Sequence, residues 1–126
     1  MLAILSDDLL DASKIMAFAR AEGMIFFWAK NASELCERVL REGAQLCVLD
    51  LQLSGLDLEK LLQQMRAREH APVIVGYGSH VHRERLQLAR NLGCDLVLPR
   101  SAFFEQVKAG IKDWLKLRQE DQARIS

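Results

Sequence analysis

The sequence lacks the features that mark secreted and membrane-spanning proteins. Its three cysteines are Cys36, Cys47 and Cys94, with no Cys-x-x-Cys pair among them. An odd number of scattered cysteines argues against a disulfide framework and for reduced thiols in a cytoplasmic protein. No apolar run approaches the roughly 20 residues of a membrane helix, and two aspartates interrupt the first run too early for a signal peptide. We therefore expect a cytoplasmic protein without a membrane segment.

An excess of charge of one sign is also absent. The 17 lysines and arginines balance 17 aspartates and glutamates, so the formal net charge is zero. A neutral chain is not attracted over long distances to nucleic acid or to a membrane surface, so neither is an expected partner. Half of the 126 residues are hydrophobic, which suits one globular domain. We assign this domain to residues 1–117, followed by a polar tail at 118–126.

Short apolar runs alternate with amphipathic segments along the chain. The runs predict strands at 2–6, 24–29, 46–50, 72–77 and 95–98. The segments between them predict helices near 9–22, 33–42, 57–69 and 81–92, and a last helix from 102 to about 120. Five successive strand–helix units indicate an α/β fold, in which helices cover both faces of a parallel sheet.

Aspartates stand at the ends of two of the predicted strands. Asp7 and Asp8 follow the first strand, and Asp50 ends the third. The carboxyl ends of parallel strands share one edge of the sheet, so these carboxylates should converge. Crowded like charges are relieved by a cation, and Mg²⁺ prefers oxygen ligands. The pattern predicts a Mg²⁺ site at Asp7, Asp8 and Asp50 with the backbone carbonyl of Gln52. The alternative is that Asp7 and Asp8 only stabilise the start of the first helix.

The order and spacing of these features resemble the receiver domain of two-component response regulators. The resemblance covers residues 1 to about 117, and the segment DLQLSGLD from Asp50 to Asp57 resembles the family's D-x-x-M-P-x-M-D loop. It implies a flavodoxin-like doubly wound sheet with strand order 2-1-3-4-5. It also implies a non-enzymatic signalling protein of a phosphorelay. In such a protein Asp50 would accept a phosphoryl group from a histidine kinase or phosphotransfer protein, and a downstream protein partner would read the signal.

Three positions depart from the family pattern. Tyr77 stands where receivers have a serine or threonine at the end of the fourth strand, and Leu98 replaces the lysine that precedes Pro99. The position of the aromatic switch residue falls on Asp95. Mg²⁺-dependent phosphoryl acceptance at Asp50 is therefore one expectation. A degenerate pseudo-receiver, which signals through a fixed surface without a phosphorylation switch, is the alternative.

A segment rich in glycine follows the fourth predicted strand at the same edge. Two glycines would let the backbone approach a ligand closely, and Ser79 could cap the next helix. The predicted anion or partner loop comprises Gly76, Tyr77, Gly78, Ser79 and His80, with Arg100 as an anion clamp. A small ligand-binding domain that uses residues 76–82 is a further alternative, and a solvated Arg100 is the simpler interpretation of that residue.

The last predicted helix carries two aromatic residues beside its core stripe. Phe104, Val107, Ile111 and Leu115 fall on one face, and Phe103 and Trp114 fall on a flanking row. Helix four, strand five and helix five form the usual contact face in the proteins that this chain resembles, and aromatic anchors contribute much of the energy at interfaces. We expect a weak homodimer or a partner contact through Phe103 and Trp114, unless they simply widen the core.

Overall fold

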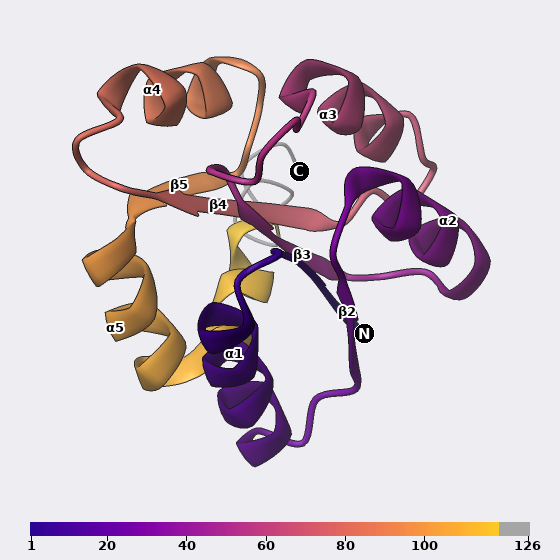
Figure 1. Ribbon diagram of the computed structural model, residues 1–126. Coiled ribbons are helices and arrows are strands. Elements are labelled where there is room, and N and C mark those ends of the chain that lie inside the picture. Colours follow the sequence, from indigo (N-terminus) through magenta and orange to yellow (C-terminus); the bar gives the residue numbers. More distant parts are fainter. Residues whose placement is uncertain (119–126) are drawn as a thin grey trace.

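The computed structural model describes residues 1–118, which form a five-stranded parallel sheet between two layers of helices (Figure 1). The strands are β1 (Leu2–Leu5), β2 (Phe26–Ala29), β3 (Leu46–Asp50), β4 (Val73–Gly78) and β5 (Leu96–Pro99). Their order is β2-β1-β3-β4-β5. The predicted fold class is confirmed. The tail predicted at 118–126 lies outside the described residues from position 119 on.

Helices cover both faces of the sheet. They are α1 (Leu9–Ala21), α2 (Ala32–Glu42), α3 (Leu58–Arg66), α4 (Arg83–Asn91) and α5 (Arg100–Gly110), with a 3₁₀ turn η1 (Ile111–Leu115). Figure 1 shows α1 and α5 on one face and α2, α3 and α4 on the other. Successive strand residues point to opposite faces, so Ala3 and Leu5 join the core under α2 to α4, whereas Leu2 and Ile4 join the core under α1 and α5. Among residues 1–118, no helix is both long and apolar enough to cross a bilayer.

The last helix differs from its predicted form. The chain was expected to stay helical from 102 to about 120, but α5 starts at Arg100 and ends at Gly110, where φ is +153°. A side chain is strained at such a positive φ, so the glycine permits the break. The η1 turn that follows has a tighter winding than an α-helix, and it brings Ile111 and Trp114 into the core.

The prediction that Phe103 and Trp114 form a pair at the surface is wrong. Phe103 is fully buried, and its ring stacks on Tyr77 (4.1 Å between centroids) and on Trp114 (5.4 Å). The Trp114 indole donates a hydrogen bond of 2.8 Å to Gln106 Oε1. Phe104, which we placed in the core stripe, is only half-buried. Phe103 and Trp114 are core residues, so they are too buried to form the expected homodimer or partner contact.

Asp95, at the position of the family's aromatic switch, has a structural role. Its Oδ2 accepts a hydrogen bond of 2.7 Å from the Ile74 N–H, and its carboxylate lies 3.7 Å from Arg66 and 3.6 Å from Arg118. The acid therefore links the start of β4 to the chain before β5. No rotating aromatic side chain is available at this position.

The buried Trp114 makes a first prediction. Trp114→Ala removes a stacked ring from the core, and we expect the free energy of unfolding to fall by about 3–5 kcal/mol. Leu40, an exposed leucine on α2, supplies the control, since Leu40→Ala should change stability by less than about 0.5 kcal/mol. Chemical denaturation followed by circular dichroism measures both. If Trp114→Ala is as stable as the Leu40→Ala control, the buried position of Trp114 is contradicted.

Candidate functional site

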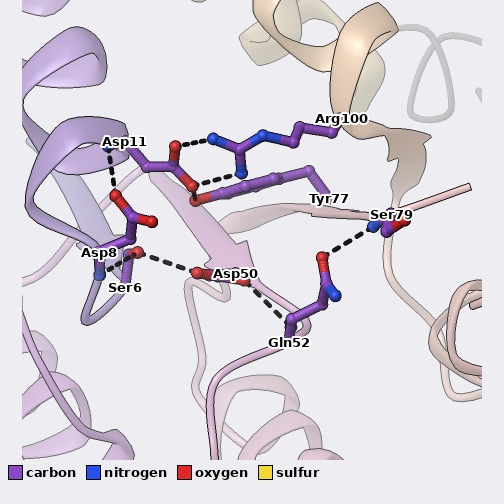
Figure 2. A network of polar contacts seen from close by, with 8 residues as sticks. All are labelled: Ser6, Asp8, Asp11, Asp50, Gln52, Tyr77, Ser79 and Arg100. Atoms are coloured by element: carbon purple, nitrogen blue, oxygen red, sulfur yellow. Dashed lines mark hydrogen bonds and ion pairs between the residues drawn. The ribbon is translucent and has the colours of Figure 1, made fainter.

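The candidate site lies at the carboxyl edge of the sheet, where β1, β3 and β4 end (Figure 2). Leu5 pairs with Leu49, so Ser6 directly after β1 lies beside Asp50, the last residue of β3. Asp50 in turn pairs with Tyr77 of β4, and Tyr77 pairs with Leu98 of β5. The parallel register alone therefore places a hydroxyl, a carboxylate, a phenol and an apolar side chain in a row across the sheet.

Both oxygens of the Asp50 carboxylate have partners in the chain itself. Oδ2 accepts a hydrogen bond from the Ser6 hydroxyl (2.9 Å), and Oδ1 accepts one from the Gln52 N–H (3.0 Å). Only 7% of Asp50 is exposed. Burial raises the pKa of Asp50, the two hydrogen bonds oppose that shift, and the charges of Asp11 and Asp7 add to it. A serine, which we did not select from the sequence, is thus the closest partner of the candidate acceptor.

The predicted acidic pair has a different arrangement. Asp7 and Asp8 are exposed, and the Asp8 Oδ1 caps α1 by accepting a hydrogen bond of 3.0 Å from the Asp11 N–H. The Asp8 N–H donates to Ser6 Oγ at 3.1 Å. Within residues 1–118, no three acidic, histidine or cysteine side chains gather closely enough to hold a metal ion. One Asp8 oxygen therefore caps the helix, and both Asp50 oxygens have hydrogen-bond partners within the chain.

Asp11 is the functional candidate that sequence reasoning missed. Asp11 is 1% exposed. The Arg100 guanidinium donates two hydrogen bonds to its carboxylate, one of 2.6 Å from Nη1 to Oδ2 and one from Nη2 to Oδ1. Its Oδ2 also accepts a hydrogen bond of 3.0 Å from the Tyr77 hydroxyl. The available signal was helical spacing, since Asp11 lies four and eight residues before the buried Ile15 and Ala19.

Arg100, the predicted anion clamp, is therefore paired within the chain. Hydrogen bonding to Asp11 raises the pKa of Arg100, which is 44% exposed along its side chain. The guanidinium neutralises Asp11, and no second cation takes its place next to Asp50, because the position on β5 is Leu98. The site as a whole stays acidic.

The predicted glycine-rich loop is largely strand. Gly76, Tyr77 and Gly78 belong to β4, because pairing with β3 and β5 continues through Gly78. A Cβ atom at Gly76 would lie 3.1 Å from the Leu51 side chain, so this glycine admits Leu51 rather than a ligand. Tyr77 is fully buried, and burial together with the Asp50 charge raises the pKa of its hydroxyl.

The remaining part of that segment lies beyond the strand. The Ser79 N–H donates a hydrogen bond of 2.9 Å to Gln52 Oε1, and Ser79 Oγ accepts one of 3.3 Å from Val81. Ser79 does not cap α4, whose N-cap is His82. His80 is exposed. The bond between Ser79 and Gln52 joins the β3–α3 and β4–α4 connections beside Asp50.

Comparisons with known proteins agree with this geometry at the level of the fold. No model of a protein family and no curated protein sequence matches the chain. A CheY-like response regulator receiver domain protein from Methanospirillum hungatei has a TM-score of 0.79 and 18% identity, over 95% of this chain and 96% of that one. The receiver domain of NtrX from Brucella abortus has a TM-score of 0.79 and 17% identity, over 92% and 98% of the two chains.

A response regulator signal receiver domain from Bermanella marisrubri gives a TM-score of 0.73 at 19% identity, over 86% of this chain and 94% of that one. The three structures come from three different organisms and are similar to this chain over most of its length. At such low identities the shared feature is the fold, which for this chain is the receiver fold.

The raised pKa of Asp50 makes a second prediction. The native carboxylate is disfavoured relative to the unfolded chain, so Asp50→Asn should raise the free energy of unfolding at pH 7, by up to about 1 kcal/mol. Because the folded pKa lies above the unfolded value, protonation favours the native state. The advantage of the variant should therefore vanish as pH falls through the folded pKa. Thermal unfolding between pH 3 and about pH 8 tests this, with the exposed Asp113→Asn as control. A destabilised Asp50→Asn variant at pH 7 would contradict it.

The Arg100–Asp11 pair makes a third prediction. Arg100→Met leaves a buried carboxylate with Tyr77 as its only side-chain donor, so we expect a loss of about 1–3 kcal/mol, at the lower end if water reaches the site. The double variant Asp11→Asn with Arg100→Met should recover part of that loss, because it removes the unpaired charge. Denaturant unfolding of both variants and of Asp11→Asn alone, with exposed Arg83→Met as control, gives the coupling energy. Additive losses would mean that the two residues act independently.

Proposed function

We propose that this chain is a receiver-like signalling protein that acts through protein–protein contacts, and that its output does not depend on phosphorylation of Asp50. The receiver fold supports the signalling role, as do the net charge of zero and the absence of a membrane-spanning helix in residues 1–118. The independence from phosphorylation rests on one observation about Asp50. Its Oδ2 accepts a hydrogen bond from the Ser6 hydroxyl, and its Oδ1 accepts one from the Gln52 N–H. We place the protein in the cytoplasm, with a downstream protein as partner.

Electrostatics support this proposal. A phosphoryl group adds negative charge to a site that already holds Asp7, Asp8 and Asp50, and Leu98 offers no cation to receive it. Arg100, the nearest candidate for that task, is held by Asp11. The new group would also have to displace the Ser6 hydroxyl or the Gln52 N–H from the carboxylate.

Conformational coupling supports it as well. A modification shifts an equilibrium only through contacts that differ between two states. Tyr77 occupies the position from which a small hydroxyl residue would reach the phosphoryl group, and its own hydroxyl is bound to Asp11. Its ring is stacked on Phe103. Tyr77 and Asp95 are both held by other contacts, so a phosphoryl group on Asp50 would form few new contacts with them and would cause little conformational change.

Phosphoryl acceptance at Asp50 is the second candidate, favoured by the position of this carboxylate at the carboxyl end of β3. A carboxylate oxygen would attack phosphorus as the bond to the nitrogen of a histidine kinase or phosphotransfer protein breaks. Mg²⁺ at Asp7, Asp8, Asp50 and the Gln52 carbonyl would neutralise charge on the transferring group. Asp7 already lies near enough for its charge to raise the pKa of Asp50.

One experiment separates the two candidates and makes a fourth prediction. The full chain is incubated with acetyl phosphate and Mg²⁺, and its intact mass is measured beside Asp50→Asn and a phosphorylatable receiver domain. We expect no added phosphoryl group, and we expect backbone amide spectra to change little at tens of millimolar Mg²⁺, consistent with weak binding at most. A phosphoryl group on the wild type but not on Asp50→Asn, with amide shifts across residues 80–100, would overturn the proposal in favour of a phosphorylation switch.

A further inference from the structure

The edge strand β2 presents an open row of backbone groups. β2 pairs only with β1 within the described sheet, and Figure 1 shows it at the end of the sheet. The N–H groups of β1 and of the residue after it donate to the carbonyl oxygens of Ile25 (2.8 Å) and Ala29 (3.2 Å). In a parallel pair, alternate residues of a strand face its partner, so Phe26 and Trp28 direct their N–H and C=O groups away from the sheet. Two donors and two acceptors form this outer edge.

The sequence of this edge is unusually apolar. Residues 24–29 read MIFFWA, with no charge and no proline, and Ile25 beside the strand is 71% exposed. Natural edge strands are commonly protected by inward-pointing charges, prolines or bulges, because a free edge recruits another strand. The open edge ends before Lys30, because the Lys30 N–H already donates a hydrogen bond of 3.3 Å to the Glu34 carboxylate. The open part is therefore short and well defined.

Three cations stand over the aromatic rings of this strand. The Arg20 guanidinium lies 5.4 Å from the centre of the Phe26 ring, and the Lys30 ammonium lies 5.1 Å from the Trp28 ring. On the opposite face, Arg38 lies 4.2 Å from the ring of the intervening Phe27. Arg38 is also paired with Glu42, whereas within residues 1–118 neither Arg20 nor Lys30 forms an ion pair. The edge thus joins outward-directed backbone groups with the positive charge of Arg20 and Lys30 on one face, whereas Glu42 offsets the charge of Arg38 on the other.

We propose that the outer edge of β2 binds an extended, acidic segment of a partner protein, which adds a sixth strand to the sheet. Backbone hydrogen bonds to Phe26 and Trp28 would supply affinity, as in other cases of strand addition. Acidic side chains at alternate positions of the added strand would lie on the face of Arg20 and Lys30. The Trp28 indole N–H donates a hydrogen bond of 2.7 Å to the Ser6 carbonyl beside the Asp50 site, but the proposed contact is made by the outer backbone of β2, so the inference does not rest on phosphorylation of Asp50.

Charge distinguishes this occupant from a second copy of the chain. In antiparallel self-pairing centred on Phe27, Phe26 of one copy lies opposite Trp28 of the other, so Arg20 faces the other copy's Lys30. Pairing centred on Phe26 or on Trp28 sets Arg20 against Arg20 or Lys30 against Lys30. Each register places like charges across from each other, which destabilises a strand pair. An acidic strand turns the same positions into attractive contacts.

A synthetic peptide tests the proposal and gives the fifth prediction. The probe is an end-capped hexapeptide that alternates glutamate with threonine or valine, and its counterpart carries lysine at each glutamate position. With the full chain, the glutamate peptide should slow hydrogen exchange at the Phe26 and Trp28 amides, while the lysine peptide should not. Arg20→Glu combined with Lys30→Glu should weaken binding of the glutamate peptide at least about tenfold, because attraction becomes repulsion.

Matched variants complete the experiment. Arg83→Glu with Lys108→Glu makes the same change in net charge at exposed positions far from β2, and it should alter the peptide affinity less than about twofold, because distant exposed charges are screened by salt. Equal binding of both peptides, unchanged exchange at Phe26 and Trp28, or a wild-type dimer that itself protects these two amides would each overturn the proposal.

Discussion

The buried carboxylate of Asp11 is the constraint on which the rest of the site depends. A charge that is 1% exposed is tolerated only if it is paired and hydrogen-bonded, and here Arg100 and Tyr77 do both. These three residues come from α1, α5 and β4. The need to satisfy one acid therefore fixes how two helices meet at the carboxyl edge of the sheet. It also engages the Arg100 guanidinium and the Tyr77 hydroxyl, both at the same edge of the sheet as Asp50.

The Asp50 carboxylate is buried without a paired cation of its own among residues 1–118, and nearby hydrogen-bond donors stabilise it. Ser6 and the Gln52 backbone supply one hydrogen bond each, and Gln52 is itself held by Ser79. Hydrogen bonds from Arg85 to the carbonyl oxygens of Leu51 (2.9 Å) and Leu56 (3.2 Å) hold both ends of the β3–α3 connection to α4. These hydrogen bonds only partly offset the burial of the carboxylate, because the pKa of Asp50 stays raised. They link Asp50 to the chain after β1 and to the β3–α3 connection at this edge of the sheet.

The sequence predicted the parts of the fold that follow from strong local patterns. Apolar runs and their alternation with amphipathic segments gave five strands, their order through the resemblance, and the position of Asp50 at a strand end. Asp11 was missed because an acid in the first turn of a helix usually stabilises the positive end from the surface. Trp114 was misplaced because Gly110 interrupts the helix, and a periodicity count cannot follow a change in winding. Phe103 was misplaced because the inward face of α5 runs through Phe103 and Val107 rather than through Phe104. The strand was predicted to end at residue 77, so only Gly78 was missed, because glycine ordinarily signals a turn; Gly76, assigned to a ligand loop, instead makes room for the Leu51 side chain.

The stacked rings of Tyr77, Phe103 and Trp114 restrict the routes by which this sequence can change. A small hydroxyl residue at position 77 would remove the ring that stacks on Phe103 at one end of the stack, leave a cavity that costs about 3–4 kcal/mol, and deprive Asp11 of a donor. A lysine at position 98 would then enter a site whose acid is already satisfied. Each step toward the usual receiver pattern is costly until the others are in place. The stack therefore couples positions 77, 103 and 114, so that a tolerated change at one of them requires compensating changes at the others.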